Sequence, residues 1–270
     1  MREGPATVIR REDYAAPAYW IRSAELTFDL DPAKTIVASK LAIERNADAA
    51  AGAPLRLHGD GLVLLRCLAD GESVSFRQED GVLVIDNPPD KASFTLEIRN
   101  TCAPEKNTQL SGLYTSGGGF FTQCEAEGFR RITYFLDRPD VMAVYTVVLR
   151  ADKAKYPVLL CNGNLLEQAD LPNGRHMAKW HDPFPKPSYL FALVAADLVC
   201  REQRITARNG KDHLLQVHVR RGDLDKTEHA MNSLIASIAW DEYKYGLSLD
   251  LERFMIVATS DFNMGAMENK

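Results

Sequence analysis

Residues 25–30 read Glu-Leu-Thr-Phe-Asp-Leu, a strict alternation of polar and apolar side chains. Successive side chains of a β-strand point to opposite faces, so this period of two predicts a strand with one buried and one solvated face. Residues 94–98 repeat the pattern, whereas residues 82–85 and 141–149 are more continuously apolar and favour central strands. Turn signals lie between these runs. Short strands at this spacing predict a large antiparallel β-sandwich or curved sheet over the first two thirds of the chain.

The pattern changes after about residue 197. Two strands are expected around residues 198–206 and 213–220, and in the second of these apolar residues alternate with polar ones. Residues 254–258 are apolar throughout, as in the middle of a covered sheet. The last part of the chain therefore contains a second, smaller sheet.

The first convincing helix lies between these strands. Asp225, with Glu228 three residues later, predicts a capping box at its start, and Gly246 suits the position just past its end. One helix over a few strands cannot cover both faces of a sheet. We therefore expect a complete β domain over residues 1–197 and, over residues 198–270, the truncated start of an α/β or α+β domain.

Composition places the chain among ordinary globular proteins. With 46% hydrophobic and 26% charged residues and a net charge of −5, disorder is excluded as the dominant state. The 37 acidic and 32 basic residues argue against a nucleic-acid partner. No apolar run reaches the length of a membrane span, and residues 1–5 lack the apolar stretch of a secretory signal. We therefore expect a cytoplasmic chain with no membrane partner.

Sequence motifs for common chemistries are missing. The chain has no G-x-S-x-G, no P-loop, no Rossmann glycine run and no H-E-x-x-H, and its six histidines form no i, i+4 pair suited to zinc. The five cysteines are odd in number and form no C-x-x-C, which argues against a disulfide framework or a structural zinc site. Most are expected to be small buried groups, and nothing marks a thiol as activated. These observations alone leave the function open.

Two segments narrow the possibilities. Residues 263–269 read Asn-Met-Gly-Ala-Met-Glu-Asn, and Gly-Ala-Met-Glu-Asn is the signature of the M1 zinc aminopeptidases. Residues 123–141, Gln-Cys-Glu-Ala-Glu-Gly-Phe-Arg-Arg-Ile-Thr-Tyr-Phe-Leu-Asp-Arg-Pro-Asp-Val, resemble the matching region of the aminopeptidase N (alanyl aminopeptidase) branch of that family. The resemblance extends over the whole chain. It implies a mainly β fold, with an N-terminal antiparallel β-sandwich or saddle domain followed by the start of a thermolysin-like α+β catalytic domain.

The resemblance implies that Glu125 and Glu268 recognise the free α-amine of a peptide substrate. An α-amine is largely an ammonium ion at neutral pH. Two neighbouring carboxylates repel each other when the site is empty, and an arriving cation relieves that repulsion. Gln123, two residues before Glu125, would share its strand face and add a neutral hydrogen bond. Such a pocket selects a chain terminus and rejects an internal peptide bond.

By resemblance, residues 263–269 also supply backbone and side-chain contacts to the substrate. Gly265 and Ala266 would form a small-residue edge strand on which a peptide backbone can pair. Met264 matches a family position at the pocket for the first side chain of the substrate. A flexible thioether suits a pocket that accepts several apolar side chains. The implied substrate-binding residues are Gln123, Glu125, Met264, Gly265, Ala266, Met267, Glu268 and Asn269.

Plainer interpretations exist for each of these residues. Glu125 would ordinarily be a solvated carboxylate at a strand end, and Met264 and Met267 would ordinarily belong to a core. Glu127 has the same local pattern as Glu125 and no assigned role, so it serves as an internal control.

The chain departs from the family in one respect. In the family, the zinc ligands, the general base and the tyrosine that stabilises the oxyanion follow Gly-Ala-Met-Glu-Asn, so all of them would lie beyond Lys270. We therefore expect no catalytic and no metal-binding residue in this chain, and a segment that is inactive alone although its parent enzyme uses zinc. The alternatives are a naturally short, non-catalytic module that binds peptide N-termini or a partner chain, and an epoxide-hydrolysing relative. Ala266 and residues 123–141 argue against the last.

Overall fold

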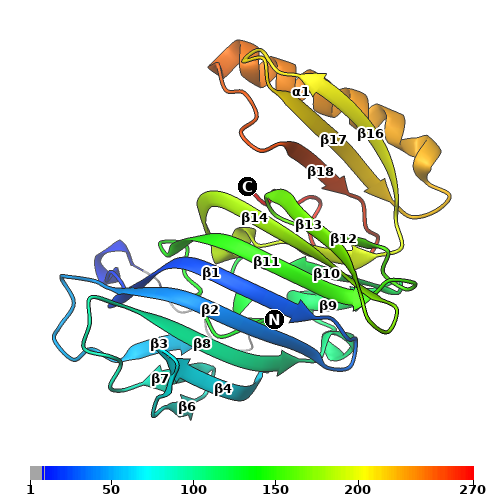
Figure 1. Cartoon of the computed structure of the whole chain (residues 1–270). Coiled ribbons are helices and arrows are strands. Elements are labelled where there is room, and N and C mark those ends of the chain that lie inside the picture. The colour runs from blue at the N-terminus through cyan, green and yellow to red at the C-terminus, as the bar shows by residue number, and fades with distance from the viewer. Residues whose placement is uncertain (1–7, 9) are drawn as a thin grey trace.

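A large eight-stranded sheet forms the base of the molecule in the computed structural model, which describes residue 8 and residues 10–270 (Figure 1). In spatial order its strands are β13 (Asn164–Leu171), β14 (Arg175–Pro187), β11 (Met142–Asp152), β1 (Tyr19–Asp29), β2 (Thr35–Arg45), β8 (Ser93–Cys102), β4 (Val63–Ala69) and β5 (Glu72–Ser73). The alternation that predicted β1 is confirmed, because Leu26 and Phe28 are buried while Thr27 is half-buried. The predicted mainly β fold is likewise confirmed.

One pair of neighbouring strands in this sheet is parallel, whereas the sequence predicts an antiparallel sheet. β1 and β11 run in the same direction, with Leu26 opposite Val147. A parallel pair needs a long crossover connection. The chain supplies one here, because all the strands from β2 to β10 lie between β1 and β11 in sequence.

Two smaller sheets pack against the large one. The first consists of β12 (Val158–Cys161), β15 (Leu193–Ala196), β10 (Gly119–Gln123) and β9 (Gly112–Ser116), and the second of β3 (Leu55–His58), β7 (Val82–Ile85) and β6 (Arg77–Glu79). One continuous apolar core lies between the sheets, with Phe28 stacked on Phe191 at 6.0 Å between ring centroids. The two runs predicted as central strands, in β7 and β11, both lie in sheet interiors.

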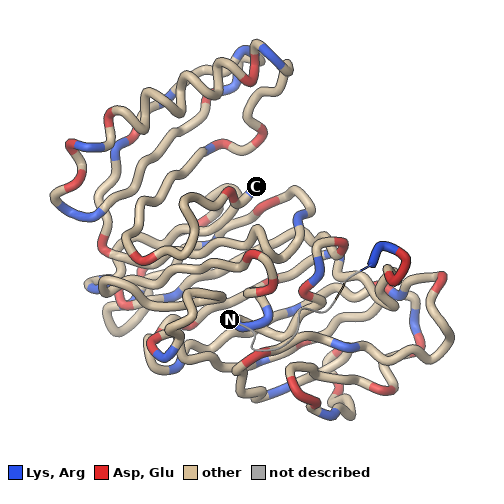
Figure 2. The backbone as a smooth tube through the Cα atoms, turned by 180° about the vertical axis from the view of Figure 1, so that it is seen from behind, with Lys and Arg blue, Asp and Glu red and all other residues tan. Residues whose placement is uncertain are grey.

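A short 3₁₀ helix, η1 (Arg11–Asp13), precedes β1, and three others connect strands of this part: η2 (Pro104–Lys106), η3 (Phe129–Arg131) and η4 (Ser188–Leu190). We call residues 19–196 the β part. Basic and acidic residues are interspersed along the backbone here and in the rest of the chain (Figure 2).

The remainder, residues 199–270, forms a smaller unit that we call the C-terminal part. Its three-stranded sheet has the order β16 (Val199–Thr206), β17 (Asp212–Val219) and β18 (Arg253–Val257), and α1 (Glu228–Tyr245) covers the face turned away from the β part (Figure 1). Six buried residues form the core between helix and sheet: Leu215, Val217, Val219, Met231, Leu234 and Ile238. The expected domain boundary at residue 197 stays a prediction.

The opposite face of this sheet meets the β part. Met255 and Val257 pack against the large core, and the guanidinium of Arg253 lies 5.3 Å from the ring centroid of Trp180. Gln216 and His218, on the polar side of the predicted alternation in β17, are consequently buried. The two parts therefore share an interface that mixes apolar and polar side chains.

Two local expectations for the C-terminal part are wrong. The predicted capping box is not formed, because Asp225 lies inside a 3₁₀ turn, η5 (Leu224–Thr227), and α1 begins at Glu228 after Thr227. The Thr227 hydroxyl instead donates to the Leu224 carbonyl and accepts from the Arg201 guanidinium. Gly246 does end α1 in the left-handed conformation, at φ 68°, as expected.

β18 is the second exception. Within the described residues it pairs with β17 alone and forms the edge of the sheet, not its middle. Phe254 is accordingly 39% exposed. In residues 8 and 10–270, no helix combines the length and apolarity that a membrane crossing requires.

Candidate functional site

Gln123 occupies the last position of β10, where the strand faces the C-terminal part. Side chains alternate along a strand, so Gln123 shares the face of Phe121. The Phe121 ring packs with Tyr114 in a small apolar cluster, and Val257 from β18 packs against that cluster. The Gln123 side chain is 1% exposed, and neither its Nε2 nor its Oε1 has a hydrogen-bond partner within the described chain. A buried amide left unpaired costs roughly 1–3 kcal/mol, and such groups concentrate where a ligand or water completes the bonding.

Glu125 lies beyond the end of the strand. β10 stops at Gln123, so the expectation that the two side chains share a strand face is wrong. The chain instead turns sharply, with the Gly128 amide donating to the Cys124 carbonyl at 2.7 Å. Glu125, Ala126 and Glu127 form the exposed tip of this turn.

The base of the turn is tightly packed. A Cβ added to Gly128 would stand 2.7 Å from the Gln123 carbonyl oxygen, so a side chain has no room there. The next residue, Phe129, is fully buried, with its ring centroid 4.9 Å from that of Phe135 and 5.1 Å from that of Phe191. The Glu125 carboxylate therefore stands on a turn fixed to the large core.

Glu127, the control residue, has a different environment. Its carboxylate lies 3.3 Å from the Arg130 guanidinium. No ion pair or hydrogen bond of the Glu125 side chain occurs within the described residues. The structure thus distinguishes two carboxylates that are alike in sequence.

The segment after β18 crosses the four-stranded sheet. The Tyr114 hydroxyl donates to the Asp261 carbonyl at 2.9 Å, the Ser116 hydroxyl bonds the Asp261 carboxylate, and Asn263 donates to the Leu110 carbonyl at 3.2 Å. Burial, with a smaller contribution from the Asp261 charge, raises the pKa of Tyr114 to about 12, so this phenol stays a donor at neutral pH. Residues 261–263 are thereby tied to β9 and the loop before it.

A second set of bonds holds the end of the segment. Asn162, in the turn between β12 and β13, donates from Nδ2 to the Asn269 carbonyl at 2.8 Å, and Asn269 donates to the Leu190 carbonyl at 3.2 Å. The Lys270 ammonium lies 2.9 Å from the Asp250 carboxylate and 3.8 Å from the ring centroid of Phe184. Sequence reasoning missed Asn162, although the pair Asn162-Gly163 is a turn signal.

Between these anchors, residues 264–268 have irregular backbone. The edge strand expected at Gly265 and Ala266 is not formed within the described chain. Gly265, Ala266 and Glu268 are exposed, Met264 is 41% exposed, and Met267 is half-buried. A Cβ added to Gly265 would meet no atom within 4 Å, so one side of this backbone is open.

The two groups of predicted residues lie at the same end of the four-stranded sheet. The Thr122 hydroxyl, beside Gln123, accepts from the Leu193 amide at 2.8 Å, and the Ala192 amide next to it donates to Asn162 Oδ1 at 2.7 Å. Asn162 then contacts Asn269. The structure therefore brings Gln123 and Asn269 to one region, while Glu125 and Glu268 stand exposed on separately anchored segments and share no hydrogen bond.

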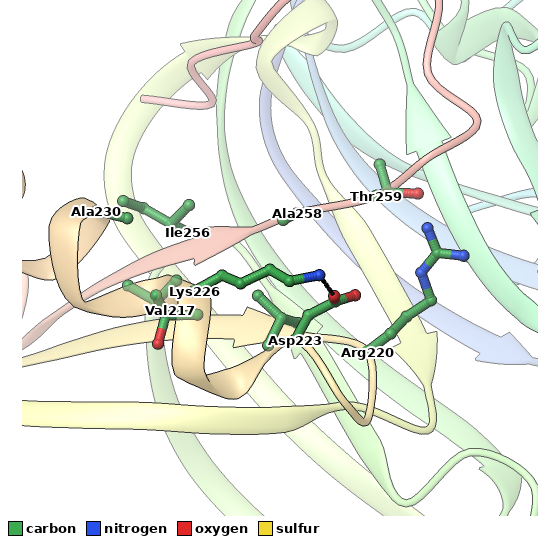
Figure 3. Close-up of a pocket in the computed structure, with 10 residues that line it drawn as sticks. Val217, Arg220, Asp223, Lys226, Ala230, Ile256, Ala258 and Thr259 are labelled. Atoms are coloured by element: carbon green, nitrogen blue, oxygen red, sulfur yellow. Dashed lines mark hydrogen bonds and ion pairs between the residues drawn. The ribbon is translucent and has the colours of Figure 1, made fainter.

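One cavity of the C-terminal part lies apart from the predicted site residues. It has a volume of about 290 Å³ and lies between the start of α1 and β18, lined by residues that include Val217, Ile256 and Thr259 (Figure 3). Its charged pair, Lys226 and Asp223, is mutually satisfied, with Nζ 2.5 Å from Oδ1. None of the predicted site residues lines this cavity.

The described residues contain no set of side chains that could bind zinc. No three His, Cys, Asp or Glu side chains of residues 8 and 10–270 come together in a way that could hold a metal ion. Burial raises the pKa of Cys102 and of Cys161 to about 12, so these thiols are poor nucleophiles at neutral pH. Four of the five cysteines are buried, as expected. The residues present do not fit a catalytic zinc site.

Comparison with known proteins gives a consistent result. The sequence model of the Peptidase M1 N-terminal domain matches residues 22–190. The chain is 51% identical to aminopeptidase N of Escherichia coli (strain K12) over 96% of its own length and 30% of that protein, and 44% identical to aminopeptidase N of Caulobacter vibrioides over 100% and 31%. A crystal structure of Legionella pneumophila aminopeptidase A in complex with aspartic acid matches with a TM-score of 0.91 and 31% identity, over 96% of this chain and 31% of that one. The chain thus spans about a third of the length of these relatives.

Proposed function

This chain belongs to the M1 peptidase family, and on that premise we propose that it supplies the α-amine recognition half of a zinc-dependent aminopeptidase active site. The observation that carries the proposal is the buried, unpaired carboxamide of Gln123, next to a turn that presents the exposed carboxylate of Glu125. The relatives named aminopeptidase N, and the amino acid bound to the Legionella enzyme, support a substrate with a free α-amine.

The chemistry follows from charge. The α-amine of a peptide has a pKa of about 8 and carries a positive charge over most of the neutral range. Glu125 and Glu268 attract that cation from two segments, and Gln123 Oε1 accepts a hydrogen bond from one of its N–H groups. An internal peptide bond has no cation to offer, so the site selects chain ends.

The remaining predicted residues place the first residues of the peptide. The open backbone at Gly265 and Ala266 can accept a peptide strand, because Gly265 leaves space for a second backbone. Met264 and Met267 offer flexible apolar surface to the first side chain. Asn269 holds the segment in place through its two contacts with the β part.

We propose that the segment itself neither binds catalytic zinc nor hydrolyses peptides. The support is the lack of a three-ligand cluster in the described residues. The test is an assay of the purified chain with an alanyl chromogenic substrate and added zinc. We expect no turnover above that of buffer with zinc alone. Turnover that a chelator abolishes would contradict the proposal.

The amine site is tested by two matched substitutions. An alanine dipeptide amide, titrated into the isotope-labelled chain, should shift the NMR signals of residues 123–128 and 264–269. Glu125→Gln and Glu268→Gln should each weaken its binding about tenfold, because each removes one charge that faces the ammonium. Glu127→Gln, whose carboxylate already pairs with Arg130, should leave binding within about twofold. An equal effect of all three substitutions would reject the assignment.

A further inference from the structure

Every hydrogen-bonding atom of the Asn162 side chain has a partner. Its Nδ2 donates to the Leu190 carbonyl at 3.0 Å and to the Asn269 carbonyl at 2.8 Å, and its Oδ1 accepts from the Ala192 amide at 2.7 Å. These partners come from two separate segments, one before β15 and one at the end of the chain. The Asn269 side chain in turn donates a hydrogen bond of 3.2 Å to the Leu190 carbonyl, which also accepts from Asn162. Asn162, Leu190 and Asn269 are therefore all linked by hydrogen bonds.

The turn that carries Asn162 is rigidly placed. Gly163 adopts φ 87°, and a Cβ at this position would lie 2.2 Å from the His181 carbonyl oxygen in β14, so the turn lies directly against the large sheet. On the other side, β12 pairs with β15, with Cys161 opposite Leu193. Asn162 is thus fixed to the β part by strands before and after it.

The segment that it holds has no comparable support. Residues 264–268 belong to no strand or helix and are mostly exposed. Within the described chain, the side-chain hydrogen bonds that join residues 263–269 to the β part are those of Asn263 at one end and of Asn269 at the other. The place of Glu268 therefore depends on the contacts of the residue that follows it.

We propose that Asn162 is a positioning residue that fixes the backbone of residues 267–269 relative to the end of β10. This inference rests on the proposed function, because it assigns to Asn162 the task of holding Glu268 where it can share an ammonium ion with Glu125 and Gln123. Asn162 itself does not contact the substrate.

Two substitutions and one control separate positioning from general stability. Asn162→Asp keeps the acceptor for the Ala192 amide and loses both Nδ2 donors, whereas Asn162→Ala loses all three bonds. The added negative charge in Asn162→Asp would by itself favour a cation, so weaker amine binding by this variant must come from the lost donors. Asn164→Ala is the control. Asn164 also bridges to the C-terminal part, by accepting from the Glu252 amide at 2.9 Å, and no hydrogen bond joins its side chain to residues 263–269 in the described chain.

The first measurement needs no ligand. The backbone ¹H–¹⁵N nuclear Overhauser effect of residues 267–270 should fall toward the values of a mobile chain in Asn162→Asp and Asn162→Ala, because both variants lose the hydrogen bond that holds the Asn269 carbonyl. Asn164→Ala should leave these residues unchanged. An unchanged nuclear Overhauser effect in both Asn162 variants would overturn the inference, whether or not the chain binds amines.

The second measurement is the affinity for an alanine dipeptide amide. Both Asn162 variants should bind it about fivefold more weakly, with circular dichroism and melting temperature close to those of Asn164→Ala. If the unaltered chain binds the dipeptide and both Asn162 variants bind it equally well, the positioning role is wrong and the proposed function stands. If the unaltered chain shows no preference for a free amine, the proposed function fails, and the first measurement still decides whether Asn162 holds the segment.

Discussion

The β part and the C-terminal part differ in how much core supports each of them. The β part buries one continuous cluster between three sheets, with large aromatic side chains such as Phe129 and Trp180 at its centre. The C-terminal part buries six residues between one helix and one sheet. The two carboxylates of the candidate site lie in different parts. Glu125 stands on a turn fixed to the large core of the β part, and Glu268 stands on an irregular segment of the C-terminal part. If the two carboxylates share an amine as proposed, its binding depends on how well the C-terminal part is docked onto the β part.

The largest expected effect comes from matched truncations in the two cores. Leu149→Ala, at a fully buried position in β11, should destabilise the whole protein by about 2–5 kcal/mol. Leu234→Ala, at an 8% exposed position in α1, should unfold the C-terminal part while leaving the near-UV circular dichroism of the β part intact. Hydrogen exchange checks this, because residues 198–270 should already be less protected than the β part before any substitution. Uniform protection over both parts would contradict the comparison.

The second largest effect on stability is expected from a substitution in the turn that carries Glu125. Gly128→Ala places a Cβ 2.7 Å from the Gln123 carbonyl oxygen and 2.9 Å from the Gly112 amide nitrogen, so the backbone must shift. The expected loss of stability is about 1–3 kcal/mol in urea unfolding, together with weaker amine binding. Gly128 has an ordinary negative φ of −85°, so the penalty is steric, and a neutral result would show that the turn is looser than described.

Lowering the pH should reduce the stability of the two parts, through a different histidine in each. Burial lowers the pKa of His218 in β17 and of His58 in β3 below 6.5. The unfolded chain then binds more protons than the folded one as pH falls below about 6.5, so stability falls with it, by at most about 1.4 kcal/mol per pH unit for one proton.

The matched substitutions separate these contributions. His218→Gln should flatten the pH dependence of the C-terminal part between pH 7 and 5, and His58→Gln that of the β part. The measurement is hydrogen exchange at several pH values, with the intrinsic rates divided out. Equal flattening of both parts by either substitution would show that they unfold as one unit.

The smallest expected effect on stability is at Gly265. A Cβ there meets no atom within 4 Å and φ is not positive, so Gly265→Ala should change the free energy of unfolding by less than about 0.5 kcal/mol. It should nevertheless weaken peptide binding, because the methyl group occupies the space for the peptide backbone. The contrast with Gly128→Ala tests whether the two glycines have separate roles. Unchanged peptide affinity would remove Gly265 from the site.

Local patterns predicted much of this fold and rather less of the site. The alternation of polar and apolar residues correctly predicted β1 and β8, because each strand has one face on the core. Gly246 was correctly predicted to end α1, because the left-handed conformation at that position favours glycine. The parallel pairing of β1 with β11 could not be predicted, since it joins residues more than a hundred positions apart. Asp225 failed as a cap because the Thr227 side chain contacts Leu224 and Arg201 at the start of α1.

The site shows the same limit. Glu125 and Glu268 came from motifs, and the turn at Gly128 and the end of β10 at Gln123 became visible only in three dimensions. Asn162 was missed because its Asn-Gly pair indicates only a turn. Its hydrogen-bond partner, Asn269, lies 107 residues away. Contacts over that distance depend on the docking of the two parts, which no local pattern encodes.

The most direct test of the account is the ratio of two dissociation constants for the unaltered chain, one for an alanine dipeptide amide and one for its N-acetylated form. Acetylation removes the positive charge and leaves the rest of the ligand in place. If the chain carries the amine-recognition half of an aminopeptidase site, the free amine should bind at least about tenfold more tightly at pH 7, and high salt should reduce the difference. Equal affinities for the two ligands would contradict the account.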